Sequence, residues 1–236
     1  RMSSRRVVVT GMGIISPVGN DLEVAWEQVV GGHSGIGPIT DFDVSQFSTR
    51  FAGSIRNFDA SQYIPAKELK KMDPFMHFGI AAASQAIVHA GLPDSGHGLD
   101  RIGVAMGSGI GGVGTIEANH ARLQEGGPRK ISPFFVPGTI INMISGHVSI
   151  QHGYRGPNIA LVSACTTATH CIGMAARLIA HGDADVMLAG GAEHGGKGRL
   201  RERVLAQTAE ELGSDLVAGG EEEEVEEDAL DDRVDL

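Results

Sequence analysis

Cys165 is the residue of this sequence whose surroundings best suit covalent chemistry. It ends the apolar run ALVSAC, which is typical of a buried strand, and it begins the run CTTATHCIGMAARLIAHG, which has helical spacing. A cysteine at the start of a helix lies beside backbone N–H groups that have no partner within the helix. Those groups favour the thiolate form of the sulfur and can stabilise the oxyanion of a thioester. The position therefore suits a nucleophile that carries an acyl group, with a small packed cysteine as the alternative.

The remaining cysteine and the histidines offer no comparable pattern. Cys171 lies six positions after Cys165, which places it on another side of the same helix, and we expect it to be packed. This spacing suits neither a disulfide framework nor a zinc site. The sequence has ten histidines, and we expect His170, inside the same helix, to pack rather than to act as a base. No metal and no cofactor are therefore predicted.

The elements that must position Cys165 alternate along the chain. Strands are predicted over residues 5–10, 101–106, 158–163 and 185–189. Helices are predicted from Asn20 or Asp21 to Gly31, from Asp73 to Gly91, over 115–124, up to about His152, and over 165–182, whereas residues 34–65 are expected to be irregular. Strands that alternate with helices imply an α/β fold with a largely parallel sheet and helices on both of its faces.

Charge is distributed unevenly along the 236 residues. The formal net charge is −10, yet residues 1–193 carry 14 basic and 15 acidic side chains, and residues 194–236 carry 5 and 14. The composition predicts that the acidic segment 194–236 is disordered. A nearly neutral body provides no field for nucleic acid. No apolar run approaches the roughly 20 residues of a membrane helix, and no signal peptide is evident, so we expect a cytoplasmic protein without a membrane partner.

Five blocks of the sequence resemble the β-ketoacyl-acyl carrier protein synthases, in the order of that family. The run SACTTATHCIG, residues 163–173, is similar to the active-site block of the family, with Cys165 at the nucleophile position. The other blocks are RRVVVTGMGIISPVG at 5–19, MGSGIGG at 106–112, GGPRKISPFFVPGTIINM at 126–143 and GDADVMLAGGAE at 182–193. A competing motif, GMGIIS, is one glycine short of a dinucleotide-binding fingerprint and is rejected.

The resemblance is closest to the type II elongating synthases of fatty acid biosynthesis, and it implies a thiolase-like fold. The implied activity is that of a 3-oxoacyl-[acyl carrier protein] synthase. Cys165 would take an acyl group from acyl carrier protein, and malonyl carrier protein would then lose CO₂ and attack the thioester. The same resemblance implies a homodimer, with its interface near residues 133–143, and no cofactor.

Seven further residues receive roles from the resemblance. Ile110 and Phe135 would line the tunnel for the acyl chain, with ordinary core packing as the alternative. Carrier protein is acidic, so a basic patch is needed to bind it. The residues that resemble the docking cluster of the family are Lys67, Lys70 and Lys71, to which Arg129 and Lys130 could add. The alternative for these charges is a solvated helix face.

The sequence also departs from the family. The remaining catalytic groups of the family are two histidines, a lysine and a glycine-rich loop, and all of them belong to a C-terminal half for which no counterpart is found here. Residues 1–193 are therefore predicted to be most of an N-terminal ketosynthase domain, and 194–236 an unrelated tail. We expect that this chain alone does not condense acyl and malonyl units. Two alternatives remain: another cysteine acyl-transfer enzyme of the thiolase type, and an inactive fragment or pairing subunit.

Overall fold

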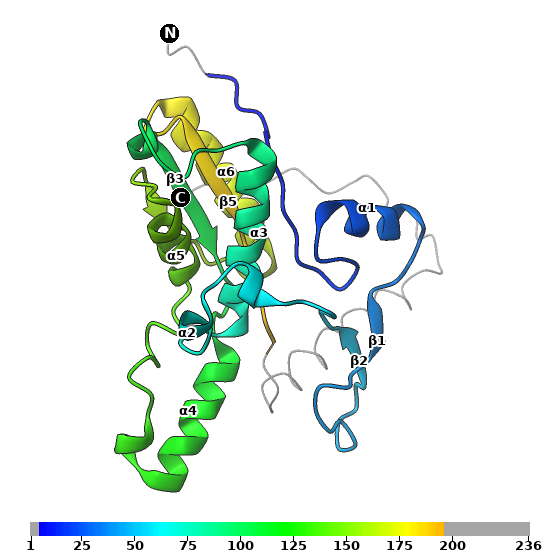
Figure 1. Cartoon of the computed structure of the whole chain (residues 1–236). Helices are drawn as coiled ribbons and strands as arrows, with labels where there is room; N and C mark the ends of the chain where they lie inside the picture. Colours follow the sequence, from blue (N-terminus) through cyan, green and yellow to red (C-terminus); the bar gives the residue numbers. More distant parts are fainter. Residues whose placement is uncertain (1–4, 196–236) are drawn as a thin grey trace, which may run out of the picture.

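A parallel three-stranded sheet forms the centre of the fold. The structure is a computed structural model, and it describes residues 5–195. The strands lie in the order β4 (Asn158–Ile159), β3 (Ile102–Gly107) and β5 (Val186–Gly191), and both pairings with β3 are parallel. Figure 1 shows β3 and β5 next to each other, with α3 and α6 close by. The acidic segment predicted to be disordered lies, beyond Gly195, outside the described residues.

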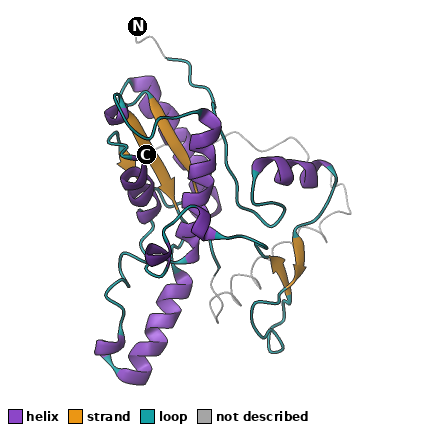
Figure 2. Ribbon diagram, in the orientation of Figure 1, coloured by secondary structure: helices purple, strands orange, loops and turns teal. Residues whose placement is uncertain are grey.

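Helices cover both faces of this sheet, as predicted. The side chains of Val104 and Met106 belong to the larger core, which α3 (Pro74–Ala90) and α5 (Met143–His152) complete. Ala105 points the opposite way and packs with Cys171 on α6 (Thr167–His181). All six residues of β3 are buried, as expected of a central strand in a parallel sheet. The α/β class predicted from the sequence is therefore confirmed (Figure 2).

The predicted helix ends are largely confirmed because local capping signals determine them. Asp73 caps α3 by accepting the Phe75 N–H, Pro74 occupies the first turn, and Gly91 ends the helix in the left-handed conformation. Asp21 likewise caps α1 (Leu22–Val30) by accepting the Val24 N–H. The polar helix predicted over 115–124 is α4 (Val113–Gly126), which extends away from the sheet in Figure 1.

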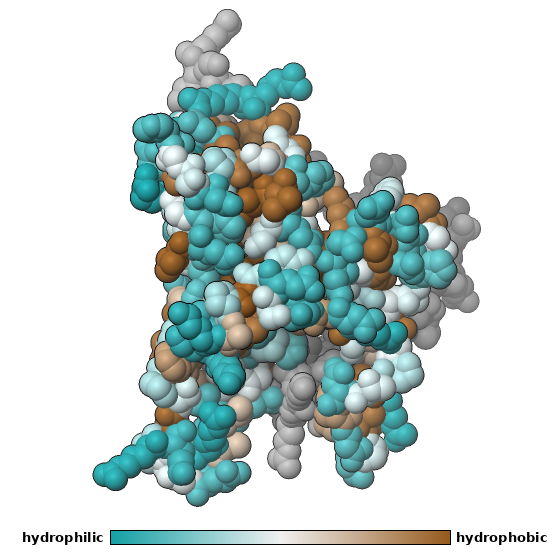
Figure 3. All heavy atoms as spheres, viewed as in Figure 1, coloured by the Kyte–Doolittle hydropathy of each residue, from teal (hydrophilic) through white to brown (hydrophobic). Residues whose placement is uncertain are grey.

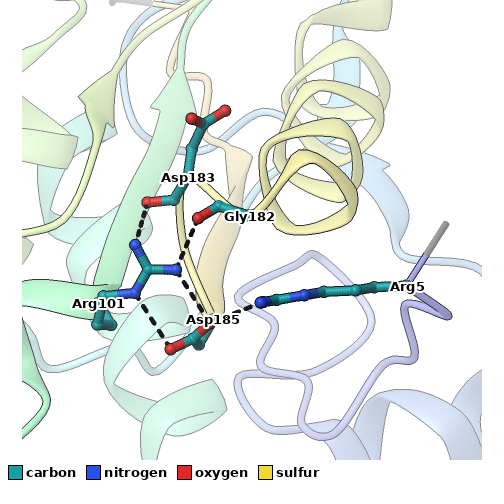
Figure 4. Close-up of polar contacts among 5 residues, drawn as sticks. All are labelled: Arg5, Arg101, Gly182, Asp183 and Asp185. Carbon is teal, nitrogen blue, oxygen red and sulfur yellow. Dashed lines mark hydrogen bonds and ion pairs between the residues drawn. The ribbon is translucent and has the colours of Figure 1, made fainter. Parts of the chain in front are cut away.

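A cluster of charges joins β3 to β5 at their amino ends (Figure 4). The Arg101 guanidinium donates to both carboxylate oxygens of Asp185, at 3.2 and 3.1 Å. It also donates, at 2.7 Å, to the carbonyl of Gly182, which is the C-cap residue of α6. Arg5 donates to the same carboxylate at 2.9 Å. These hydrogen bonds lower the pKa of Asp185 to about 2. The cluster therefore ties the two strands, the end of α6 and the N-terminal segment together.

The buried strand predicted over residues 5–10 is not formed. Val8 and Val9 are exposed by 66% and 76%, and within the described chain residues 5–10 pair with no strand. Both edges of β3 are already occupied, by β4 and β5. The chain instead runs along α3, where the backbone N–H groups of Met12 and Ile14 donate to His89 and Gln85.

Two other elements differ from the prediction. The strand predicted over 158–163 pairs with β3 through only two residues, because the Ser145 hydroxyl accepts the Met106 N–H and lies 2.8 Å from the Ile159 carbonyl oxygen. Within the segment expected to be irregular, a short antiparallel ribbon joins β1 (Ile36–Pro38) to β2 (Phe51–Gly53). The remaining described elements are α2 (Ala66–Leu69) and the 3-10 turns η1 (Ala60–Gln62), η2 (Leu99–Arg101), η3 (Pro128–Lys130) and η4 (Ala164–Thr166).

Apolar side chains also reach the surface. Trp26 and Val30 on α1 and Val88 on α3 are exposed by 67%, 68% and 81%. Figure 3 shows hydrophobic groups of this kind scattered among hydrophilic ones over the face in view. Within residues 5–195, none of the helices has the length and apolar character needed to cross a membrane.

Candidate active site

Cys165 lies in a sharp turn between the sheet and α6. Cys165 is the middle residue of the turn η4, and only Thr166 separates it from the first residue of α6; its thiol is exposed, whereas that of Cys171 is buried. The predicted junction of strand and helix is thus present, with the cysteine in a 3-10 turn that precedes the helix. An exposed thiol next to the start of a helix can be reached by a substrate carbonyl.

The backbone of this turn is strained and tightly held. Ala164 has a φ of 50°, the left-handed region that a residue with a Cβ adopts at a cost of about 1–3 kcal/mol. The buried Thr167 hydroxyl donates to the Ala164 carbonyl at 2.8 Å and accepts the Ser163 N–H at 3.0 Å. The Thr166 hydroxyl donates to the Ser163 carbonyl at 2.9 Å. Two threonines therefore hold the chain in the conformation that presents Cys165.

Two glycines allow the loop after β3 to pack against this turn. A Cβ at Gly107 would clash with the Leu161 carbonyl oxygen and lie 3.0 Å from Thr167 Cγ2. A Cβ at Gly109 would lie 3.3 Å from the Ala164 Cα. The glycines of the GSGIGG run therefore permit a close approach of two backbones.

A hollow of about 270 Å³ opens beside the thiol. Its wall is mainly apolar and includes Ile14, Ile55 and Phe78, with Glu193 as a charged member. No histidine or lysine from residues 5–195 lines it. A larger groove of about 1070 Å³ between α1 and α3 contains Trp26 but does not reach Cys165, so the smaller hollow, which Cys165 lines, is the candidate site.

Cys171 is structural, as predicted. Its side chain is fully buried and packs with Ala105 of β3 and Ala175 of α6. Burial raises the pKa of its thiol. His170, in contrast, does not pack: it is exposed, and its Nδ1 lies 2.6 Å from the Ser163 hydroxyl. The expectation of a packed histidine was wrong because residue 170 faces away from the sheet, unlike its neighbour at 171.

Comparison with known proteins identifies the family. The sequence pattern of the family described as "Beta-ketoacyl synthase, N-terminal domain" matches residues 4–204. The chain belongs to the β-ketoacyl synthase family. The resemblance found in the five sequence blocks is thereby confirmed.

Curated β-ketoacyl synthases are similar to most of this chain. The 3-oxoacyl-[acyl-carrier-protein] synthase 2 of Vibrio cholerae is 58% identical over 192 residues, which are 81% of this chain and 46% of that protein. The enzymes of the same name from Coxiella burnetii and Staphylococcus aureus are 51% and 46% identical, again over 46% of their length. The chain therefore spans about half the length of the curated relatives it matches.

Solved ketosynthase structures share the fold. The ishigamide ketosynthase/chain length factor superimposes with a TM-score of 0.75 at 26% identity, over 88% of this chain and 51% of that one. A β-ketoacyl synthase from Burkholderia phymatum STM815 gives a TM-score of 0.73, also at 26% identity, over 88% of this chain and 50% of that one. A ketosynthase in complex with its type II acyl-carrier protein gives 0.72 at 26% identity, over 86% and 54%. The thiolase-like class is thus confirmed.

The two residues expected to line an acyl tunnel are not among those that line the hollow. Ile110 is 56% exposed and lies in the loop that packs against the cysteine turn. Phe135 is half-buried in the turn region before α5. Their role in binding an acyl chain in this β-ketoacyl synthase stays a prediction.

The five basic residues differ in their availability to a partner. Lys67 and Lys70 are exposed, as are Arg129 and Lys130 in η3. Lys71 is half-buried: it forms an ion pair with Glu68 at 2.9 Å and lies 5.2 Å from the centre of the Phe134 ring. The hydrogen bond from Lys71 is the main cause of a lowered pKa at Glu68. Lys71 is thus partly neutralised, and the joint docking role of the five residues remains a prediction.

Glu193 and Ser108 are site residues that the sequence reasoning missed. One Glu193 oxygen accepts the Ser108 hydroxyl at 2.9 Å, and the other accepts the Gly109 N–H at 2.6 Å. The partners are 84 and 85 positions apart in the sequence, so no local pattern could connect them. The available signal was their place after neighbouring parallel strands, since the carboxyl ends of such strands meet at one edge of the sheet.

Proposed function

We propose that Cys165 of this β-ketoacyl synthase chain carries an acyl group as a thioester. The Cys165 sulfur attacks the carbonyl carbon of an acyl thioester on carrier protein, the bond from carbon to the carrier sulfur breaks, and the carrier leaves as a thiol with a proton. The observation that carries this proposal is the exposed thiol on a strained turn, open to a mainly apolar hollow. A thiol so placed is accessible, and the hollow favours a hydrocarbon chain over water.

The complete reaction that we propose for the parent enzyme is the synthesis of a 3-oxoacyl-[acyl carrier protein]. Malonyl carrier protein loses CO₂, and the resulting carbanion attacks the acyl carbon on Cys165. A carbon–carbon bond forms, and Cys165 departs as the thiolate. The name that the curated relatives share supports this proposed reaction. The described residues of the hollow include no histidine or lysine to stabilise the carbanion, so we assign the loading step alone to them.

The proposed partner is acyl carrier protein. One similar solved structure is a ketosynthase in complex with such a carrier. In this chain, the exposed ammonium groups of Lys67 and Lys70 would attract an acidic partner. The proposed docking set also includes Lys71 and the η3 residues Arg129 and Lys130. A docking contact of this kind weakens as salt screens it over about 8–10 Å.

We also propose a homodimer that uses the region of residues 133–143. The side chains of Phe134, Val136 and Ile140 are exposed by 43%, 58% and 39%. Exposed apolar groups that gather in one segment are typical of protein interfaces. The free thiol that the loading step needs suits a reducing compartment, and we propose the cytoplasm.

Loading can be tested on the 236-residue chain itself. The chain is incubated with an acyl carrier protein that bears a hexanoyl group, and the acylated peptide is located by mass spectrometry. We expect one acyl group on Cys165 and none on Cys171. Cys165→Ala abolishes loading, whereas Cys171→Ala, the matched control, retains it provided that circular dichroism shows a folded chain. Acylation that persists in Cys165→Ala contradicts the proposal.

A further inference from the structure

Glu193 places a negative charge in the wall of the hollow beside Cys165. The other described residues that line the hollow are apolar residues, glycines, Thr167 and Cys165 itself. None of the lysines, arginines and histidines among residues 5–195 lines it. The charge of Glu193 therefore has no opposite charge within this wall, and a group that enters the hollow lies close to it.

Two hydrogen bonds hold the Glu193 carboxylate in place. One oxygen accepts the Ser108 hydroxyl at 2.9 Å, and the other accepts the Gly109 N–H at 2.6 Å. Ser108 is fully buried, and its hydroxyl oxygen also accepts the Gly111 N–H at 3.0 Å, so the hydroxyl has a fixed position. Both donors to the carboxylate are neutral, so its net charge is retained. The charge is thus fixed beside the hollow instead of being carried on a freely rotating side chain.

The small size of the hollow makes this charge effective. A sphere of about 270 Å³ is roughly 8 Å across, so a second carboxylate in the hollow would lie within one Debye length, about 8–10 Å, of Glu193. Repulsion between two like charges about 6 Å apart disfavours entry by roughly threefold at the dielectric constant of water and roughly a hundredfold at that of a protein surface. Glu193 is exposed but the surrounding wall is mainly apolar, so we expect an effect between these limits.

We propose that Glu193 is a specificity-determining residue: its carboxylate disfavours the loading of Cys165 by acyl groups that end in a carboxylate, and it leaves the loading of neutral acyl groups unhindered. This inference rests on the proposed loading of Cys165. The bond changes are the same for both kinds of donor, because the Cys165 sulfur bonds to the acyl carbon and the carrier leaves as a thiol with a proton. The donors differ in the charge that they bring into the hollow.

This selection matters because one substrate of the proposed reaction carries a carboxylate. The malonyl group of malonyl carrier protein is itself a thioester, and its transfer to Cys165 would occupy the thiol that must hold the acyl chain. A negative charge beside the thiol disfavours that transfer. Glu193 thereby keeps Cys165 available for neutral acyl groups.

The effect of the charge is measured first without a carrier protein. Iodoacetamide and iodoacetate are alkylating reagents of similar shape, and iodoacetate alone is charged. The alkylation rates of Cys165 are compared in the wild type, Glu193→Gln and Glu125→Gln by peptide mapping. Glu193→Gln removes the charge and keeps an amide oxygen that can accept the Gly109 N–H. Glu125→Gln is the matched control, because this exposed carboxylate of α4 lies outside the hollow.

We expect Glu193→Gln to raise the ratio of iodoacetate to iodoacetamide rates at Cys165 by roughly threefold to tenfold. Glu125→Gln should leave this ratio at the wild-type value. In 1 M salt, where the Debye length is about 3 Å, the difference between the wild type and Glu193→Gln should shrink. An unchanged ratio in Glu193→Gln at low salt overturns the inference, because the charge then has no effect at the thiol.

Two acyl donors are then compared on the full 236-residue chain. Carrier protein bears either an adipoyl group, which ends in a carboxylate, or the neutral methyl ester of that group. We expect the wild type to load the methyl ester faster, and Glu193→Gln to raise the ratio of adipoyl to methyl ester loading by roughly threefold or more, with no change in Glu125→Gln. A wild-type chain that loads neither donor overturns the proposed loading and the inference with it. A wild-type chain that loads the methyl ester, with the same donor ratio in Glu193→Gln, overturns the inference alone.

Discussion

The two ends of strands β3 and β5 are built on opposite principles. At the amino ends, the guanidinium of Arg101 and the carboxylate of Asp185 bridge the strands on the exposed surface. At the carboxyl ends, Gly107 and Gly109 have no side chains, so the turn that carries Cys165 can lie close to their backbone. The first arrangement joins elements through partly solvated charges, and the second does so through backbone contact. The comparison indicates that polar side chains join the elements at the amino end of the sheet, whereas the carboxyl end leaves room for the turn that carries Cys165.

The largest expected effect is the difference in reactivity between the thiols of Cys165 and Cys171. Cys165 projects from the carboxyl end, whereas Cys171 lies under the face of the sheet with a pKa raised by burial. In the folded chain we expect iodoacetamide to modify Cys165 faster than Cys171 by roughly a hundredfold or more, since the buried thiol reacts only after local opening. Peptide mapping over time measures both rates. Unfolding in urea is the control and should make the rates similar; equal rates in the folded chain would break the comparison.

Gly107→Ala should be the most damaging small change at the carboxyl end. The added methyl group would clash with the Leu161 carbonyl oxygen, and overpacking of this kind costs about 1–3 kcal/mol. Urea unfolding measures the loss. Gly146→Ala is the matched control, because a Cβ at this helical position meets nothing within 4 Å and should stabilise α5 by roughly 0.5–1 kcal/mol. If both variants were equally stable, the close approach would not be real.

Thr167→Val tests the hydrogen bonds that hold the cysteine turn. The variant keeps the shape of the side chain but leaves the Ser163 N–H without its acceptor, at a cost of about 1–3 kcal/mol. We also expect slower alkylation of Cys165, since the turn can relax. Thr166→Val provides the control, because Thr166 is exposed and water can replace its bond to Ser163. A larger loss of stability from Thr166→Val than from Thr167→Val would contradict this assignment.

The smallest effect on stability is expected at the amino ends of β3 and β5, where Asp185 lies. The pKa of Asp185 is about 2 in the folded chain, below its ordinary value of 3.8, so its carboxylate stabilises the fold above about pH 4. This contribution should be lost as the pH falls from about 4 to about 2. Asp185→Asn should therefore be modestly less stable than wild type at pH 7, and the difference should disappear well below pH 2. The ion pairs are more than a third exposed, so high salt should reduce the difference at pH 7. A difference that persists well below pH 2 would point to packing instead of charge.

The sequence predicted those parts of the fold that local chemistry determines. Asp73 with Pro74 and Gly91 located both ends of α3, because caps act within a few residues. The position of Cys165 at a strand-to-helix junction followed in the same way from adjacent runs of residues. The predictions that were wrong concern segments whose structure depends on contacts with distant parts of the chain. The valines at 7–9 resemble a buried strand, but the segment that follows them is bonded to His89 and Gln85 of α3, more than 70 positions away in the sequence.

Contacts between distant segments also explain what was missed at the site. The Ser145 hydroxyl shortens β4 by its bond to the Ile159 carbonyl, and no residue close to Ile159 in the sequence indicates this contact. Glu193 clamps a loop 84 positions away, and in the sequence it is simply the last residue of GGAE. His170 was expected to pack because its neighbours in the helix are apolar, yet it is exposed. Sequence reasoning therefore located the proposed nucleophile more readily than the residues that hold its turn.

One measurement tests the central claim most directly: the mass of the Cys165 peptide after the folded wild-type chain meets an acyl carrier protein loaded with an acyl group. The account predicts that this peptide gains one acyl group, that hydroxylamine removes it as expected for a thioester, and that the Cys171 peptide is unchanged. An unmodified Cys165 peptide in a chain whose circular dichroism shows the α/β fold would contradict the claim.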